Sequence, residues 1–171
     1  MSQNLPTIKN ELAKILTTFN PTPAPAPKVI YSSNLVTGFN TIKQLPEQFN
    51  TTDVPFIMIT SPLGQKQPYG WENMGQARHD TVIRLVCVIG SRQRALWRLV
   101  PDMDYWPDAL ASLLHGHITL NGSCQFVGKD AGARNLTFEW TPTAIKDNGV
   151  DYLGAIVDVP VTYLQVQTFI S

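Results

Sequence analysis

Residues 79–89, with the sequence HDTVIRLVCVI, are the stretch that decides the fold. After Thr81 the side chains on both alternating faces of this stretch are largely apolar. That pattern is typical of a strand covered on both faces, whereas a strand with one wet face alternates apolar and polar residues. We therefore expect residues 79–89 to form the central strand of a sheet.

The residues before this strand predict two shorter strands and a loop. The strands lie at 28–33 (KVIYSS) and 54–60 (VPFIMIT), with a polar, irregular stretch between them. Residues 61–78 contain three glycines and two prolines, which predicts a long loop. Because long loops in compact domains often carry function, its aromatic residues Tyr69 and Trp71 are candidates for contact with a partner.

The residues after the central strand predict a helix and further strands. The helix spans 107–115, with Pro107 in its first turn, Asp108 near its positive end and Gly116 as its terminator. Its buried stripe comprises Ala109, Leu110, Leu113 and Leu114. The expected strands are 118–120, 124–127, 135–140 and 152–166, the first two flanking the hairpin signal Asn121-Gly122. Pro160 lacks an N–H for a ladder and therefore predicts an edge position or a bulge.

An amphipathic helix is expected at the N-terminus. Apolar residues recur at helical spacing over 5–19, and Asn4 can cap the first turn. The alternating prolines of residues 20–27 (NPTPAPAP) then predict an extended, polyproline-like connector. Elements in this order show no βαβ alternation and no repeat. The expected fold is a single α+β domain over 1–171, with a mostly antiparallel or mixed sheet, two principal helices packed on it, and long loops.

The composition favours a protein that binds other proteins. Charged residues make up 15% of the chain, below the roughly 25% of ordinary soluble domains, so we expect partner subunits to cover part of the surface. The 13 basic and 13 acidic residues give a net charge of zero. A protein that grips DNA through its phosphates needs a basic excess, so DNA can pass near this chain without being held.

No pattern in the chain predicts a cofactor, a metal or a catalytic group. The sequence contains no phosphate-binding glycine loop, no G-x-S-x-G elbow, and no third metal ligand spaced to join His115 and His117. Cys87 and Cys124 lie in apolar surroundings and are expected to be free buried thiols. No apolar run approaches the ~18 residues of a membrane span and no secretory signal is evident, so we expect a location inside a cell or in a particle released from one.

Charged residues cluster after the central strand. The arginines at 92, 94 and 98 allow three interpretations: a DNA-facing patch, ion pairing between subunits, or a solvated turn. The aspartates at 102, 104 and 108 could bind a cation, but they lack the glycine and glutamate of a calcium loop and favour helix capping. The complete set of interface candidates is Tyr69, Trp71, Arg92, Arg94, Arg98, Asp102 and Asp104.

Five short patterns follow one another along nearly the whole chain. The first is an N-terminal helix at 5–19 that leads to a short strand at 28–33 with Tyr31. The others are TDVPFIMI at 52–59, the apolar strand at 81–89, an aromatic-proline helix at 106–115 followed by HITLNG at 117–122, and a closing Y-x-G pattern that starts at Tyr152 and continues through Val159, Val161 and Tyr163. In this order they resemble the tail terminator (tail completion) proteins of long-tailed bacteriophages. The connector at 20–27 and the stretch 61–78 make this chain longer than compact members of that family.

The resemblance implies a structural virion protein. Such a protein forms a ring, expected to be a hexamer, at the head-proximal end of the tail. It assembles in the host cytoplasm, stops tail-tube growth and offers its other face to the head connector, while DNA passes through the lumen. The family has no catalytic residues to transfer. Two alternatives remain open: another head–tail joining or minor tail protein, and a small α+β enzyme that uses His79 or His115 as acid/base.

Overall fold

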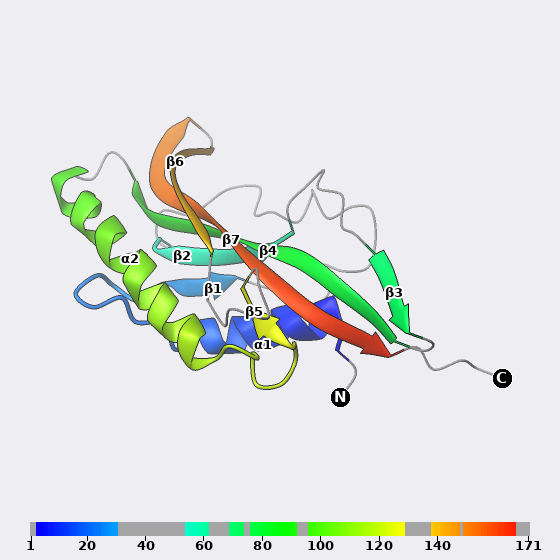
Figure 1. Cartoon of the computed structure of the whole chain (residues 1–171). Coiled ribbons are helices and arrows are strands. Elements are labelled where there is room, and N and C mark those ends of the chain that lie inside the picture. Colours follow the sequence, from blue (N-terminus) through cyan, green and yellow to red (C-terminus); the bar gives the residue numbers. More distant parts are fainter. Residues whose placement is uncertain are drawn as a thin grey trace.

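The computed structural model describes residues 3–30, 54–61, 69–73, 76–91, 96–128, 138–147 and 149–166. In these ranges, two helices accompany one seven-stranded mixed sheet, so the chain has the α+β class that the sequence predicts (Figure 1). The elements are α1 (Leu5–Leu16), β1 (Lys28–Ile30), β2 (Phe56–Thr60), β3 (Tyr69–Asn73), β4 (Gln76–Ser91), α2 (Leu96–Gly116), β5 (Phe126–Val127), β6 (Glu139–Asp147) and β7 (Val150–Val166).

Two long antiparallel strands, β4 and β7, form the centre of the sheet. Their register runs from Gln76 opposite Val166 to Ser91 opposite Tyr152, with one irregularity between Val88 and Gly90. β4 lies between β2 and β7 in the strand order, so the prediction of a central strand at 79–89 is confirmed. The strand is longer than expected at both ends because β7 supplies hydrogen-bonding partners along its whole length.

Short strands complete both sides of this pair. β2 is antiparallel to the second half of β4 and carries β1 parallel to it, while β3 pairs with the start of β4. β6 and β5 pair with successive parts of β7. Asp147 faces Val150, so β6 and β7 form a hairpin at the turn signal Asn148-Gly149. The strand expected at 135–140 differs from the observed β6, which starts at Glu139 and continues to Asp147.

Pro160 lies in a strand with neighbours on both sides, yet the side on which its N–H is missing is a local edge of the kind that the sequence predicts. It faces Val82 of β4 in an unbroken register. Its carbonyl accepts a hydrogen bond from the N–H of Gly128, on the side of β5. A strand residue directs its N–H and C=O to the same side, so the missing N–H of Pro160 is also on the side of β5. On that side, the pairing of β7 with β6 ends at Asp158 and its pairing with β5 involves Val161 and Thr162. Pro160 lies between these two stretches. No hydrogen bond of the β4–β7 ladder is lost.

The N-terminal helix is shorter than predicted but begins as expected. The side chain of Asn4 accepts a hydrogen bond from the N–H of Thr7 at 2.9 Å, which confirms the N-cap. The helix ends at Leu16, three residues early, and Phe19 then packs edge-to-face on Trp106 of α2 with ring centroids 5.4 Å apart. The connector at 20–27 is not extended throughout, since the N–H of Ala24 closes a turn onto the carbonyl of Pro21.

The second helix is much longer than the predicted 107–115. It spans Leu96–Gly116 with Pro101 and Pro107 inside it, so Pro107 does not begin the helix, although Gly116 does end it. A hydrogen-bonded turn follows, in which Leu120 and Asn121 adopt positive φ angles of 45° and 56°. The strand expected at 118–120 is therefore absent from this stretch, and β5 pairs with β7 instead of forming a hairpin with it.

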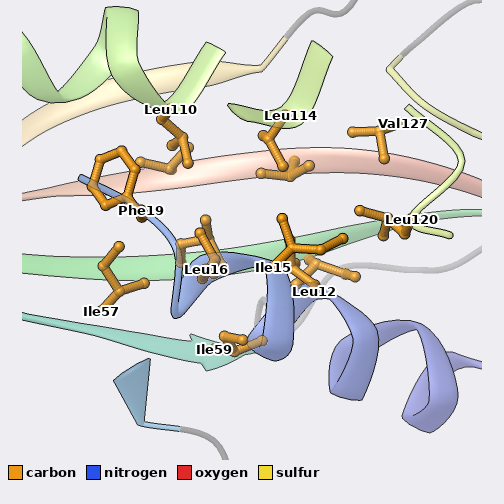
Figure 2. Packing of buried hydrophobic residues seen from close by; sticks show 14 of the residues in the cluster. Leu12, Ile15, Leu16, Phe19, Ile57, Ile59, Leu110, Leu114, Leu120 and Val127 are labelled. Carbon is orange, nitrogen blue, oxygen red and sulfur yellow. The ribbon is translucent and has the colours of Figure 1, made fainter. Parts of the chain in front are cut away.

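Both helices bury their apolar stripes in one core with one face of the sheet. Figure 2 shows Leu110 and Leu114 of α2 pointing toward Leu12, Ile15 and Leu16 of α1. The sheet contributes alternate residues to this core, including Ile57, Ile59, Ile83, Leu85, Val157 and Val159. The residues between them in sequence project to the opposite face, where Phe56, Met58, Val88 and Tyr152 form a second, smaller cluster.

Candidate inter-subunit interface

The structure separates the predicted interface residues into two groups. Tyr69 and Trp71 lie in β3, whereas Arg98, Asp102 and Asp104 lie in α2. Figure 1 shows β3 at one end of the β4–β7 pair and the first turns of α2 at the other. Arg92 and Arg94 fall outside the residues that the structure describes. The candidates therefore do not form one patch, and any contacts they make involve two separate surfaces.

The prediction of a loop over 61–78 is wrong for the second half of that segment. Tyr69 is in register with His79 and Trp71 with Ala77, so both aromatics belong to a strand with a two-residue connection, Met74-Gly75, to β4. The hairpin signal was the alternation of aromatic and other residues in YGWEN, followed by a connection that contains a glycine. The many glycines and amides of the segment favoured a loop and obscured this signal.

Asp102 and Asp104 are not first-turn caps, which corrects the capping interpretation. α2 begins at Leu96, and its first turn contains no acidic residue. Asp102 is half-buried, and burial raises the pKa of its carboxyl group above the usual value. Asp104 and Asp108 are exposed. Arg98, expected in a turn, is a helical residue four positions before Asp102.

The solvent side of α2 carries exposed apolar residues that sequence reasoning missed. Val100 is 51% exposed and Tyr105 is 45% exposed. Together with Pro101, Asp104 and Asp108 they form the α2 outer face, opposite the buried stripe of Trp106, Leu110 and Leu114. Helical periodicity over 96–106 was the available signal, but Pro107 was interpreted as the first turn of the helix. The α2 outer face is acidic and partly apolar.

The helix-free face of the sheet carries charges that are already paired. Arg84 and Asp158 face each other across β4 and β7, and Arg84 Nε and Nη2 donate to the two carboxylate oxygens of Asp158 at 2.7 Å each. This hydrogen bonding raises the pKa of Arg84. Thr162 Oγ1 donates to Asp80 Oδ1 at 2.5 Å, and Arg78 lies 3.5 Å from the same carboxylate oxygen. The Arg84–Asp158 and Thr162–Asp80 contacts link the two central strands, whereas Arg78 and Asp80 both belong to β4.

His79, Cys87 and Cys124 are buried in the described part of the chain. His79 is 5% exposed, packs on the ring of Tyr163 and projects to the opposite face from Asp80. No group of three or more possible metal ligands occurs among these residues. Cys87 and Cys124 are free and buried, as predicted, and burial raises the pKa of Cys124 to about 12.

Comparison with known proteins adds no relative. No family model matches the sequence, and no curated protein matches it either. The described helices include none that is long and apolar enough to cross a membrane.

Proposed function

We propose that this chain is a tail terminator of a long-tailed bacteriophage. It is a structural virion protein that forms a homohexameric ring at the head-proximal end of the tail, and it has no catalytic role. One side of the ring caps the tail tube, and the other meets the head connector. DNA passes through the lumen without specific binding.

The observation that carries the proposal is the role of the resembling segments in the fold. The pattern at 52–59 supplies β2, the apolar pattern at 81–89 supplies most of β4, and the closing pattern from Tyr152 lies in β7. These three strands are neighbours in one sheet, and the aromatic-proline segment at 106–115 belongs to the helix that packs on it. The segments that carry the resemblance are thus the structural frame of the chain.

The distribution of surfaces also supports a ring. A closed ring of identical subunits needs two different patches on each copy, because each subunit meets its neighbours head to tail. Figure 1 shows β3 and the first turns of α2 at opposite ends of the β4–β7 pair, and two such separated elements are compatible with a head-to-tail contact. The zero net charge agrees with a lumen through which DNA slides without being gripped.

Two other functions make different predictions. A head–tail joining or minor tail protein would share the fold and the self-association but would bind a different neighbour. An enzyme using a histidine requires that histidine to reach a substrate, yet His79 is almost completely buried. His115 is exposed at the end of α2 and is the better candidate for that alternative.

Electron microscopy of the purified protein, alone and with tail-tube protein, is the test. We expect six-fold rings of uniform size, and a mass by light scattering of six times the 19.0 kDa chain. Incubation with tubes that lack a terminator should place one ring at one end and stop further growth. Monomers under both conditions, at concentrations well above micromolar, would contradict the proposal.

A further inference from the structure

β6 is the longest strand at a border of the sheet. Among the strands that the structure describes, it pairs with β7 alone, whereas β4 and β7 have neighbours on both sides. It has nine residues, while the other border strands, β1, β3 and β5, have three, five and two. Glu139, Thr141, Pro142 and Ala144 of β6 are exposed. A border strand of this length presents a row of backbone N–H and C=O groups on which a strand of another molecule can pair.

The register of β6 on β7 fixes which of its backbone groups face outward. The carbonyl of Pro160 accepts a hydrogen bond from the N–H of Gly128, so the even-numbered residues of β7 direct their backbone groups away from β4. Each even-numbered residue of 150–158 faces an odd-numbered residue of 139–147. In an antiparallel pair such facing residues direct their N–H and C=O groups toward each other. The residues of β6 whose backbone groups face outward are therefore Trp140, Pro142, Ala144 and Lys146.

Pro142 removes a donor from the outer border of β6 and none from its pairing with β7. The nitrogen of a proline carries no hydrogen, and its ring occupies the space in which the carbonyl of an added strand would approach. A strand that paired across residue 142 would leave one of its own carbonyls without a donor. In a two-fold pairing of two β6 strands centred on residue 142, both central hydrogen bonds would be missing.

Other borders of the sheet are closed in different ways. β1 and β5 are too short to offer a long row of backbone groups. Beyond β5, the N–H of Leu164 in β7 donates to the side chain of Gln3 at 2.7 Å, so a residue next to α1 occupies that position. β6 is long and exposed, and Pro142 interrupts it near its middle.

We propose that Pro142 prevents a second copy of this chain from extending the sheet at β6. With another residue at this position, the outer border from Trp140 to Lys146 would be an unbroken row of donors and acceptors. β6 of one copy could then pair antiparallel with β6 of another. The inference goes beyond the proposed function and does not rest on it, since an unpaired border matters for a ring and for a monomer alike.

Replacement of Pro142 by threonine, the residue on either side of it, is the test. Pro142→Thr adds an outward N–H and makes the surface more polar, so any added association comes from the backbone. The variant should fold, by circular dichroism. By light scattering, it should form species larger than the wild-type assembly at concentrations at least about 10-fold lower than the wild type does. Infrared spectra of these species should show added intermolecular β-sheet.

The matched control moves the proline along the same border. Pro142→Thr combined with Ala144→Pro removes the outward N–H of residue 144, and should associate no more than the wild type. Hydrogen exchange in dilute Pro142→Thr checks the geometry directly. The N–H of residue 142 should exchange freely, whereas those of Thr141 and Thr143 should be protected by β7.

Three results would overturn the inference. They are an unchanged mass for Pro142→Thr at every concentration, a double variant that associates as strongly as the single one, and a Pro142→Thr variant that does not fold. Absence of rings from the wild-type protein would remove the proposed function but not this inference, because the test compares each variant with the wild type in whatever state the wild type adopts.

Discussion

Gly154 lies in β7 opposite Val88, where the two central strands approach closely. A Cβ atom at this position would stand 2.2 Å from the carbonyl oxygen of Cys87, which is backbone and cannot move aside. We therefore expect Gly154→Ala to lower the free energy of unfolding by at least about 2 kcal/mol. Urea denaturation measures the change. Gly116→Ala, where a Cβ meets no atom within 4 Å, is the matched control and should change stability by less than about 1 kcal/mol.

Lys9 is a half-buried lysine whose titration should affect stability. Its Nζ donates to Ser61 Oγ at 2.5 Å, and burial lowers the pKa of its amine below the usual value. Between that lowered pKa and about 10.4 the unfolded chain binds more protons than the folded chain, so stability should rise with pH in this window. Lys9→Met removes the titrating group. Stability measured between about pH 8 and pH 10.5 should rise less with pH in Lys9→Met than in the wild type, and equal slopes would refute the effect.

Among the elements, α2 offers the clearest comparison between local preference and tertiary packing. Pro107 lies in the interior of the helix, where it lacks the N–H that would bond to the carbonyl of Met103. Pro107→Ala should restore this bond and raise the free energy of unfolding by about 1–2 kcal/mol, allowing for the greater freedom of the unfolded chain. Thermal unfolding followed by circular dichroism would show the gain. Pro25→Ala in the exposed connector is the control and should not stabilise the protein. A loss of stability in Pro107→Ala would contradict this expectation and would indicate that Pro107 favours the start of a helix at that position.

For the whole molecule, the proposed ring predicts weak binding to duplex DNA. Zero net charge and neutralised pairs such as Arg84–Asp158 leave little positive charge for phosphate contacts. The dissociation constant should be no tighter than about 10⁻⁴ M at physiological salt, with little dependence on salt concentration. Fluorescence anisotropy with a labelled duplex measures both quantities. Arg94→Glu should impair assembly and leave this weak binding unchanged, whereas tight, salt-sensitive binding abolished by Arg94→Glu would indicate a protein that grips DNA.

The features that the sequence by itself determined are those with a local physical cause. Apolar side chains on both faces of 79–89 identified the central strand but not its surroundings. The helices cover only one face, and on the other face Asp80 is exposed and Val82, Arg84 and Val86 are half-buried, so the expected cover on both faces is wrong. Asn4 identified the start of α1, because a cap depends on neighbouring backbone groups alone. The burial of Cys87 and Cys124 likewise followed from the apolar residues around them.

Only the tertiary structure decided features that depend on distant partners. Tyr69 and Trp71 became strand residues because the start of β4 offered a pairing edge, and Pro160 entered the sheet because its missing N–H falls where β6 has ended and β5 begins. α2 continues through Pro101 and Pro107 because burial of Trp106, Leu110 and Leu114 against α1 and the sheet outweighs the local cost of proline. The same packing turned Asp104, Tyr105 and Asp108 outward onto one face, since helical periodicity exposes whatever lies opposite the buried stripe.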